Sequence, residues 1–407
     1  MGAVSGVRRG AAGVNLLALR SHNTALVLDL LRTAGPEGIS RLELAERTGL
    51  TPQAVSKITA RLRQEGLAAE AGRRASTGGK PRTVLRLVPE AGHALGVHLD
   101  RDELRAVLVD LDGAVVGERR APLDLGAGAD AVVAAVAREA EGLAAEALRP
   151  GASGSSFPPD PLFSPGSPSD SSSPPGSPSF PWPSSLLGLG VALPGPLDHA
   201  RGVLHRVTGF PEWDGFPLRD ALARRLGMPV VVDKDTNAAA LGLAVGGEGG
   251  SGGSFAYLHL GTGLGAGLVI GGSVHRGART GAGEFGHQVV QLDGPPCTCG
   301  GRGCVEALCL GAVARGDLDE AARVLGAGAA NLAGLLDIDL VLLGGRTVAA
   351  APEAFVRGVG AVLDARARRE GGRAGAVPVR IAPGGARGVA EGAAQLLLAP
   401  LFGRGDA

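Results

Sequence analysis

The sequence predicts an α/β protein in which a small helical domain precedes a larger domain of alternating strands and helices. Two observations support this fold class. Apolar residues make up 44% of the 407 residues, which is enough for packed cores. Apolar runs in the second half end in Gly-rich turns, as strands that alternate with helices do. The length corresponds to two to four domains of roughly 100–200 residues each.

The sequence gives no sign of membrane insertion or secretion. No apolar run approaches the roughly 18 residues that a membrane span needs, and Met1–Arg20 lacks the apolar core of a signal peptide. We therefore expect a soluble, cytoplasmic protein without a membrane partner.

Charge is distributed unevenly along the chain. The 40 Lys and Arg side chains balance 40 Asp and Glu side chains, so the formal net charge is zero. Residues 1–90 carry 14 basic and 7 acidic side chains, a net charge of +7, and the remainder carries 26 basic and 33 acidic, a net charge of −7. The neutral total therefore hides a basic first domain, which leaves nucleic acid open as a partner.

The first ninety residues follow the pattern of a small helical domain behind a flexible arm. Residues 1–23 are rich in Gly, Ala and Arg without a periodic pattern, and we expect a mobile arm there. Apolar residues three and four positions apart predict a helix over Thr24–Thr33. Ser40 and Glu43 form a capping box that begins a second helix, which Gly49 ends.

A third helix and a basic hairpin complete this domain, for which we expect bounds of 24–90. Thr51 caps the helix, and Pro52 suits its first position. Alternating residues over Val84–Val88 predict the second strand of a hairpin whose tip is rich in Gly and Arg. Three helices followed by a hairpin with a basic tip are typical of a winged helix-turn-helix.

This arrangement suits double-stranded operator DNA. A helix fits the major groove, and arginines of a wing reach phosphates or the minor groove. The residues expected to contact DNA lie on the third helix and the wing: Gln53, Ser56, Lys57, Arg61, Arg73, Arg74, Lys80 and Arg82. A homodimer or tetramer is expected because such domains bind two halves of a palindrome. The alternative is a protein-contact module with a solvated charged face, but the basic hairpin favours DNA.

Residues 91–407 form the larger domain, with one interruption. Residues 150–185 contain 11 Pro and 13 Ser in 36 positions, which predicts a disordered insertion. Its aromatic residues leave a docking motif open as an alternative to a plain excluded loop. We expect a helix over Ala129–Leu148, two strands within Gly96–Glu118 around an Asp112-Gly113 turn, and further strands over Gly188–Pro196, Val230–Val232, Phe255–Leu260 and Asp339–Leu343.

Three cysteines and a histidine have the spacing of a metal site. The cysteines fall within eight residues, and the histidine precedes the first of them by ten. The four expected ligands of a structural, tetrahedral Zn²⁺ are His287, Cys297, Cys299 and Cys304. A disulfide is the weaker alternative without a secretion signal. Cys309 is expected to be a core residue.

Two carboxylates flank this metal loop. Glu284 precedes His287 by three residues, and Glu306 follows Cys304 by two. A bound zinc would fix His287 and bring both carboxylates together, where they make good acceptors for neighbouring sugar hydroxyls. Each could be an ordinary surface charge, but their coupling to one metal loop favours a shared site.

Four motifs, in this order, carry a resemblance to the ROK family (repressors, open reading frames and kinases). It covers about Gly92–Leu401, and the winged helix is similar to that of the family's repressor branch. Asp235–Asn237 resembles the family's catalytic-Asp motif, and Leu260–Gly267 together with Gly283–His287 resembles the family signature. Cys297–Glu306 resembles the zinc motif, and Leu343–Gly345 resembles the adenosine-side motif.

The resemblance implies a two-lobed actin-like ATPase fold of the sugar-kinase type with a hexose-like ligand between the lobes. By analogy, Asp235 would be the general base in a kinase member. The residues implied to hold sugar hydroxyls are Gly195, Asp235, Glu284, His287 and Glu306. Those implied to cradle phosphates are Gly261, Thr262, Gly263 and Gly265.

The chain departs from the kinase pattern where phosphate must bind. Family kinases begin the domain with a DxGGT-type loop, whereas His98–Glu103 contains no glycine and three carboxylates. Lys234 replaces the Asn that precedes the catalytic Asp. Phosphoryl transfer depends on positioning and charge neutralisation, so we expect that catalysis is lost, that Asp235 and the phosphate glycines are vestigial, and that ATP and Mg²⁺ are not cofactors.

We therefore interpret the sequence as a carbohydrate-responsive transcriptional regulator, a repressor of carbohydrate metabolism genes. One alternative is an active ATP-dependent, glucokinase-like ROK sugar kinase with an incidental DNA-binding domain, which Asp235 supports. Another is a regulator without ligand response that acts through a protein bound at the Pro/Ser-rich insertion.

Overall fold

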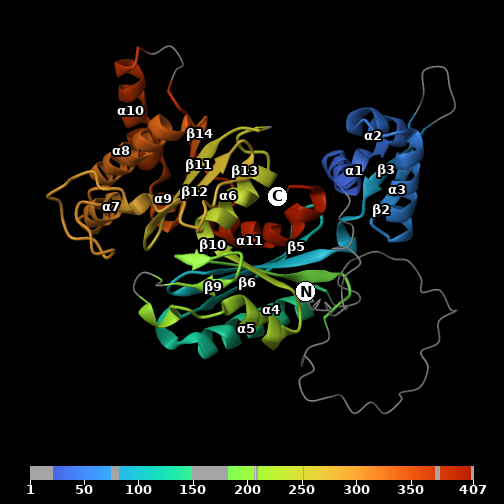
Figure 1. Cartoon of the computed structure of the whole chain (residues 1–407), viewed down its shortest axis with the longest axis horizontal. Helices are drawn as coiled ribbons and strands as arrows, with labels where there is room; N and C mark the ends of the chain where they lie inside the picture. The colour runs from blue at the N-terminus through green and yellow to red at the C-terminus, as the bar shows by residue number, and fades with distance from the viewer. Residues whose placement is uncertain are drawn as a thin grey trace, which may run out of the picture.

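The computed structural model describes residues 22–74, 82–148, 182–205, 207, 210–250, 252–371 and 376–404. Within them, a small domain of helices and a hairpin stands beside two lobes, each built on a five-stranded sheet (Figure 1). The arm expected at 1–23 lies outside the described residues except for its last two positions. The Pro/Ser-rich insertion expected at 150–185 lies outside them except for residues 182–185.

The first domain has the elements of a winged helix-turn-helix. Its helices are α1 (His22–Thr33), α2 (Arg41–Thr48) and α3 (Pro52–Gln64), and its hairpin pairs β2 (Ala68–Arg74) with β3 (Arg82–Leu87). The sequence did not predict β1 (Ile39–Ser40), which is only two residues long and pairs with β3.

Both predicted helix caps in this domain are confirmed, and the first helix begins at His22, two residues before the predicted start. The Ser40 hydroxyl accepts a hydrogen bond from the Glu43 amide, and the Glu43 carboxylate accepts one of 2.8 Å from the Ser40 amide. The Thr51 hydroxyl accepts one from the Ala54 amide, with Pro52 in the first turn of α3. Caps of this kind contribute about 1 kcal/mol each.

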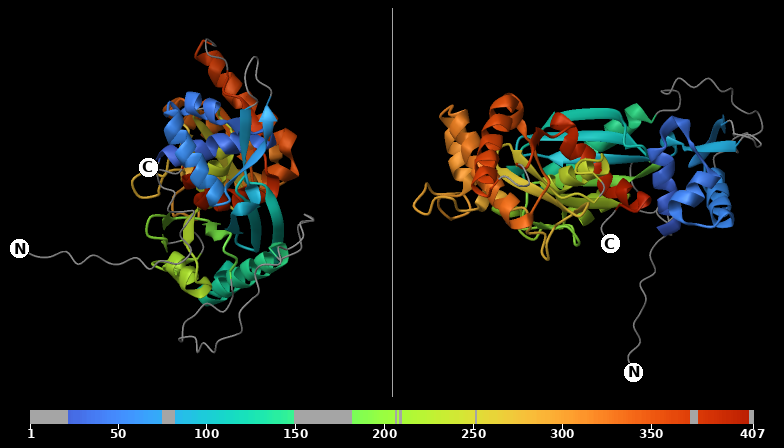
Figure 2. Two further views of the ribbon diagram at one scale, coloured as in Figure 1. Left: turned by 90° about the vertical axis from the view of Figure 1, so that its right-hand side faces the viewer. Right: turned by 90° about the horizontal axis from the view of Figure 1, so that it is seen from above.

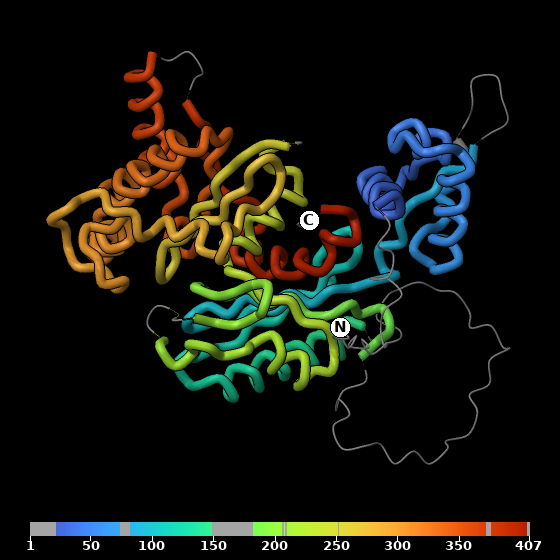
Figure 3. The backbone as a smooth tube through the Cα atoms, in the orientation of Figure 1, coloured from blue at the N-terminus to red at the C-terminus, as the bar shows by residue number. Residues whose placement is uncertain are grey.

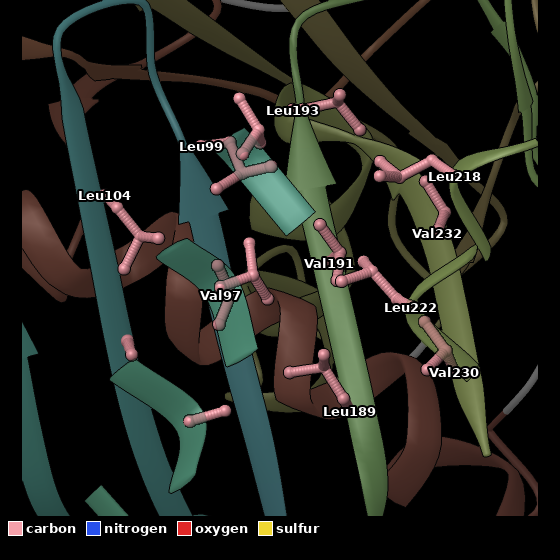
Figure 4. Packing of buried hydrophobic residues seen from close by; sticks show 14 of the residues in the cluster. Val97, Leu99, Leu104, Leu189, Val191, Leu193, Leu218, Leu222, Val230 and Val232 are labelled. Atoms are coloured by element: carbon pink, nitrogen blue, oxygen red, sulfur yellow. The ribbon is translucent and has the colours of Figure 1, made fainter. Parts of the chain in front are cut away.

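The first lobe is built on a mixed sheet with the strand order β10-β7-β4-β5-β6. Helices α4 and α5 pack on it, and their apolar side chains meet Val97, Val191 and Val232 from the sheet (Figure 4). The elements are β4 (His93–Leu99), β5 (Glu103–Asp110), β6 (Val115–Pro122), α4 (Ala129–Ala147), β7 (Leu186–Leu193), α5 (Leu218–Leu226) and β10 (Val230–Lys234). A short hairpin, β8 (Leu197–Asp198) with β9 (Val203–Leu204), follows β7.

The prediction of two strands within Gly96–Glu118 was wrong, because this region contributes to three. Strand β4 ends at Leu99, and β5 begins at Glu103. The turn between them is a run of charged residues, Asp100 to Glu103, and contains no Gly or Pro to mark it. Asp100 stabilises the reversal, since its carboxylate accepts a hydrogen bond of 2.8 Å from the Arg101 amide.

The second lobe is built on a sheet with the strand order β13-β12-β11-β14-β15. Strands β11 and β12 form an antiparallel hairpin, whereas β14 lies parallel to β11. The strands are β11 (Phe255–Leu260), β12 (Leu264–Ile270), β13 (Ser273–Val274), β14 (Leu340–Gly344) and β15 (Val379–Ile381), and the helices are α7 (Val305–Ala314), α8 (Leu318–Leu336), α9 (Arg346–Ala350) and α10 (Pro352–Arg369). Short 3₁₀ turns lie at Gly35–Glu37, Pro89–Ala91, Leu125–Ala127, Pro211–Trp213, Phe285–His287 and Gly385–Arg387.

Helices α6 (Asp235–Val245) and α11 (Gly388–Leu398) pack together between the two sheets (Figure 3). Their backbones approach closely at Gly392, where an added Cβ would lie 2.0 Å from the carbonyl oxygen of Ala238. Similarly, a Cβ on Gly190 of β7 would lie 1.8 Å from the carbonyl oxygen of Ala393. Small residues therefore place α11 directly on the first sheet and on α6.

The winged domain packs against the C-terminal end of the chain (Figure 2). Helix α11 continues into a 3₁₀ turn over Ala399–Phe402, which shares a hydrophobic core with Leu31 of α1. The guanidinium of Arg404 lies 3.0 Å from the Asp29 carboxylate, and that of Arg32 lies over the Phe402 ring. A continuous packed path therefore leads from α6 through α11 to α1.

A membrane-spanning helix is not found in the part of the chain that the structure describes, since every helix there is too short or too polar.

Candidate functional site

A small cavity of about 90 Å³ lies between the two lobes, at the carboxyl ends of β7 and β10. The turn after β7 and the start of α6 line it from one side, and the loops after β13 and before α7 line it from the other. All five residues expected to hold sugar hydroxyls line this cavity: Gly195, Asp235, Glu284, His287 and Glu306. The fold thus gathers residues that lie far apart in the sequence.

Asp235 is the first residue of α6 and directly follows β10. Its carboxylate accepts a hydrogen bond of 2.6 Å from the Thr236 amide, and the helix N-terminus stabilises its negative charge. His98, at the end of β4, is buried and interacts with Asp235. Burial lowers the pKa of the His98 imidazole, although the charge of Asp235 opposes the shift. Asp235 is therefore an oriented acceptor with a predominantly neutral imidazole beside it.

Lys234 links the two lobes at the wall of this cavity. Its side chain is 3% exposed, and its Nζ donates to Glu284 Oε1 at 3.0 Å and to the Ala282 carbonyl at 2.5 Å. A Cβ on Gly195 would lie 2.7 Å from the Lys234 side chain. The lysine that departs from the kinase pattern thus holds Glu284 in place, and Gly195 leaves room for it.

Glu306 is oriented by the hairpin between β11 and β12. Its Oε2 accepts a hydrogen bond of 2.8 Å from the Leu264 amide, and its Oε1 accepts one of 3.4 Å from the Thr298 hydroxyl. Because each oxygen has a partner, the carboxylate faces the cavity in one defined orientation.

The four predicted metal ligands converge beside this cavity. Their donor atoms all lie within 4.8 Å of one another. His287 Nδ1 is 3.7 Å from Cys297 Sγ, and Cys299 Sγ is 3.8 Å from Cys304 Sγ. Ligands at about 2.0–2.3 Å from a tetrahedral zinc are separated by about 3.5–3.8 Å. The residues present therefore fit such an ion, and the Cys297 amide bond to the Gly301 carbonyl closes their loop.

The thiols in this region differ in environment. The Gly301 N–H stabilises the Cys299 thiolate and lowers its pKa, whereas burial raises the pKa of Cys304 to about 12. Burial also raises the pKa of Cys309 to about 12; this thiol packs in the core of the second lobe and donates to the Ala321 carbonyl. Cys309 is thus a core residue, as the sequence predicts.

The glycines expected to cradle phosphate have another role in the fold. The Gly261 amide donates to the Gly263 carbonyl within the tight β11–β12 turn. A Cβ on Gly265 would lie 3.1 Å from the Thr236 side chain of α6. Close packing of α6 therefore requires small residues here whether or not phosphate binds. Thr262, Gly263 and Gly265 also line the small cavity.

Arg346, which is not among the predicted site residues, lies beside the turn where a kinase would bind phosphate. It begins α9, directly after the Gly344-Gly345 pair. Its Nη2 lies 2.7 Å from Asp100 Oδ2 and 2.6 Å from Asp102 Oδ1, and its Nη1 lies 2.9 Å from Asp102 Oδ2. The one feature of the sequence that could have drawn attention to Arg346 is its position immediately after the adenosine-side motif.

Arg346 and two other arginines neutralise the carboxylates of the glycine-free turn within His98–Glu103. The three carboxylates do not face the cleft as unpaired anions, because Asp100 and Asp102 pair with Arg346, and Glu103 pairs with Arg105 and Arg120. Arg346 lowers the pKa of Asp102. Burial alone would raise the pKa of Asp100, but the Arg101 amide, His98 and Arg346 together lower it. Each of the three carboxylates therefore has at least one arginine partner.

A larger cavity of about 640 Å³ lies on the other side of these residues. Gly344 and Gly345 line it together with Tyr257, whose hydroxyl is 2.9 Å from His259 Nδ1. Asp100 and His259 line both cavities, so they form part of the partition between them.

The predicted DNA-contacting residues are placed by α3 and the hairpin. Gln53, Ser56 and Lys57 are exposed on α3, with Val55, Thr59 and Leu62 buried behind them. Arg61 is also exposed, and its guanidinium donates to the Thr24 hydroxyl at 3.2 Å and lies 3.7 Å from Glu65. Arg73 and Arg82 are exposed on adjacent strands of the hairpin, Arg74 is described only as part of β2, and Lys80 lies outside the described residues.

Residues 182–315 match the model of the ROK family, and residues 36–68 match that of winged helix-turn-helix DNA-binding domains. The chain contains a ROK family domain. Its winged domain and its ROK domain therefore agree with the resemblance drawn from the motifs.

Curated ROK relatives include repressors and kinases. The xylose repressor of Bacillus subtilis (strain 168) is 26% identical over 291 residues, 71% of this chain and 65% of that protein. The N-acetylglucosamine repressor of Escherichia coli O6:H1 is 28% identical over 299 residues, 72% and 64% of the two chains. The glucokinase of Thermotoga maritima is 42% identical over 121 residues, 30% and 38%. The chain spans 59–65% of the length of the xylose repressors that it matches.

Solved structures show the same fold. A ROK family transcriptional regulator, a homologue of the MLC protein of Escherichia coli, has a TM-score of 0.69 at 19% identity, over 94% of this chain and 98% of that chain. The ROK hexokinase of Thermus thermophilus has a TM-score of 0.54 at 28% identity, over 74% and 96%. The expected two-lobed, sugar-kinase-like ROK fold with an N-terminal winged helix is confirmed.

Proposed function

We propose that this chain is a carbohydrate-responsive transcriptional repressor of carbohydrate metabolism genes. One observation carries the proposal: a winged helix with exposed Gln53, Ser56 and Lys57 is packed, through one continuous core, onto a ROK domain whose lobes enclose a cavity of hydroxyl acceptors. The relatives named as xylose and N-acetylglucosamine repressors support the same class. A cytoplasmic homodimer or tetramer acts on a palindromic operator.

The carbohydrate binds between the lobes. Asp235, Glu284 and Glu306 each have an oriented carboxylate at the cavity wall, and His287 adds an imidazole. Carboxylates accept hydrogen bonds from vicinal hydroxyls and discriminate strongly against analogues that lack them. The candidates suggested by the names of relatives are D-xylose, D-glucose and N-acetyl-D-glucosamine.

A structural zinc ion completes the site. The ligands are His287, Cys297, Cys299 and Cys304, whose donor atoms lie within 4.8 Å of one another, two of the separations being 3.7 and 3.8 Å. The ion would fix His287, which also lines the cavity, and would order the loop that leads into Glu306. Its contribution is to folding and orientation, with no part in a reaction.

Phosphoryl transfer is lost in this proposal. Arg346, Asp100 and Asp102 fill the region that a kinase needs for phosphate, and the turn contains no glycine. The alternative, an active sugar kinase, is favoured by Asp235 at the cavity wall. Coupled ADP-release assays with the three sugars separate the two functions, since turnover that disappears in Asp235→Ala would establish the kinase.

Carbohydrate and DNA binding are coupled along the packed helices. Asp235 begins α6, α6 packs on α11, and the end of α11 packs on α1 of the winged domain. A change in lobe angle on carbohydrate binding therefore moves the DNA-contacting helix. A coupling free energy of about 1–3 kcal/mol, or 5–150-fold in DNA affinity, is typical of such linkage.

The test combines DNase I footprinting on the region upstream of the gene with a thermal-shift screen of the three sugars. We expect a salt-sensitive, sequence-selective footprint that a stabilising sugar weakens. Glu284→Gln should retain the footprint and lose the sugar response, whereas Lys57→Ala should weaken the footprint and retain the thermal shift. A protein without any sequence-selective footprint would refute the proposal.

A further inference from the structure

The contact between Arg346 and the β4–β5 turn joins the two lobes. Asp100 and Asp102 follow β4 of the first lobe, and Arg346 follows β14 of the second. Three hydrogen bonds of 2.6–2.9 Å connect them, two of which reach both oxygens of Asp102. Such bidentate geometry is the stronger form of an arginine–carboxylate pair.

A second interaction across the lobes supports Asp100. The hydroxyl of Thr262, in the turn between β11 and β12, donates to Asp100 Oδ1 at 3.3 Å. Asp100 thus receives Arg346 on one oxygen and Thr262 on the other, both from the second lobe. Because Asp100 also lines both cavities, these contacts close the side of the small cavity that adjoins the larger one.

Solvent reaches this contact more readily than two other ion pairs between the lobes. The side chains of Arg346 and Asp102 are 47% and 61% exposed, and that of Asp100 is 18% exposed. In contrast, Arg276 and Asp233 are 8% and 2% exposed, and Lys234 is 3% exposed although its partner Glu284 is 44% exposed. A half-exposed pair opens and closes at low cost and responds to salt, which is the behaviour that a reversible closure requires.

We propose that Arg346, Asp100 and Asp102 form a clasp that holds the two lobes closed over the small cavity and thereby strengthens carbohydrate binding. A ligand held between lobes binds the closed state, so its apparent affinity scales with the fraction of molecules that are closed. The clasp raises the fraction of closed molecules through hydrogen bonds between its own side chains. The effect on carbohydrate binding rests on the proposed function, whereas the closure of the lobes does not.

Closure is tested on the full-length protein by amide hydrogen exchange without ligand or DNA. Arg346→Ala should speed exchange about two- to fivefold in both the turn at 100–103 and the start of α9. The matched control is Arg323→Ala, which removes an exposed bidentate pair with Glu320 inside α8 and should leave both segments unchanged. Raising NaCl should bring the wild type towards Arg346→Ala.

The result that refutes the clasp is faster exchange at α9 alone, which would mean that Arg346 only caps its own helix, or no change in either segment. Asp102→Asn provides a second variant, since Asp102 is exposed and lies in the other lobe. It should loosen the same two segments even if Arg346→Ala does not fold.

Calorimetric titration tests the effect on carbohydrate binding with whichever of D-xylose, D-glucose and N-acetyl-D-glucosamine stabilises the wild type. Arg346→Ala should bind it more weakly, by the ratio of the closed fractions of the wild type and the variant, since apparent affinity follows the closed fraction. Equal affinity in a variant whose lobes have loosened would refute this effect. If none of the three binds the wild type while Arg346→Ala still loosens both segments, the carbohydrate assignment fails and the closure stands.

Discussion

The packing of α6 on α11 can be tested at Gly392, where the structure predicts the sign of a small substitution. Replacing a helical glycine with alanine ordinarily stabilises a protein, by up to about 1 kcal/mol. At Gly392 the added Cβ would lie 2.0 Å from the Ala238 carbonyl oxygen and 2.4 Å from its carbon. Both atoms belong to backbone, so relief requires α6 and α11 to move apart by more than 1 Å, judged against contacts of about 3.5 Å.

The magnitude follows from the two opposing contributions. Overpacking of a core costs about 1–3 kcal/mol and sometimes more, which exceeds the gain in helix propensity. We expect Gly392→Ala to lower the free energy of unfolding by about 1–3 kcal/mol. At about 2–4 °C per kcal/mol, the midpoint of thermal unfolding should fall by about 2–12 °C.

Thermal and urea unfolding followed by circular dichroism provide the assay, with Gly360→Ala as the matched control. Gly360 lies in α10, and a Cβ there would meet no described atom within 4 Å. Gly360→Ala should therefore stabilise the protein by up to about 1 kcal/mol. A Gly392→Ala protein as stable as Gly360→Ala would contradict the close backbone packing and the proposed path from Asp235 to the winged domain.

Three further outcomes are expected. Elemental analysis should find one zinc ion per chain, retained in Cys309→Ser and lost in Cys304→Ser, because only the second removes a proposed ligand; loss in both would point to unfolding. Lys57→Ala should reduce the slope of log affinity for DNA against log salt by about one, whereas Arg323→Ala should leave it unchanged. Burial raises the pKa of Glu391, so the fold favours the protonated carboxyl. This stabilisation is fully present below the pKa of the unfolded chain and is lost as pH rises through the folded pKa. Glu391→Gln should therefore raise the unfolding midpoint at pH 7.5 more than at pH 4, and an equal effect at both values would contradict this.

Local chemistry explains why much of the winged domain could be predicted. The Ser40 and Glu43 caps, and Thr51 before Pro52, act within one turn of helix, so their geometry depends on neighbours in the sequence. The metal loop is predictable for the same reason, since His287 and the three cysteines lie within 18 residues. The turn at 100–102 was not predicted, because its charged residues include no Gly or Pro, in contrast to the Asp112-Gly113 turn that follows.

By itself, the sequence determined the winged helix, the alternation of strands and helices and the spacing of the Cys and His cluster, and the resemblance named five residues that line the small cavity. Only the tertiary structure decided which arginine pairs with each carboxylate of the turn at Asp100–Glu103. Arg346 is 246 positions from Asp100, and Lys234 is 50 positions from Glu284. Pairing over such separations depends on two sheets meeting across α6 and α11. The distance between the two sheets cannot be predicted from sequence periodicity or spacing, because it depends on how closely the small residues let α6 and α11 pack.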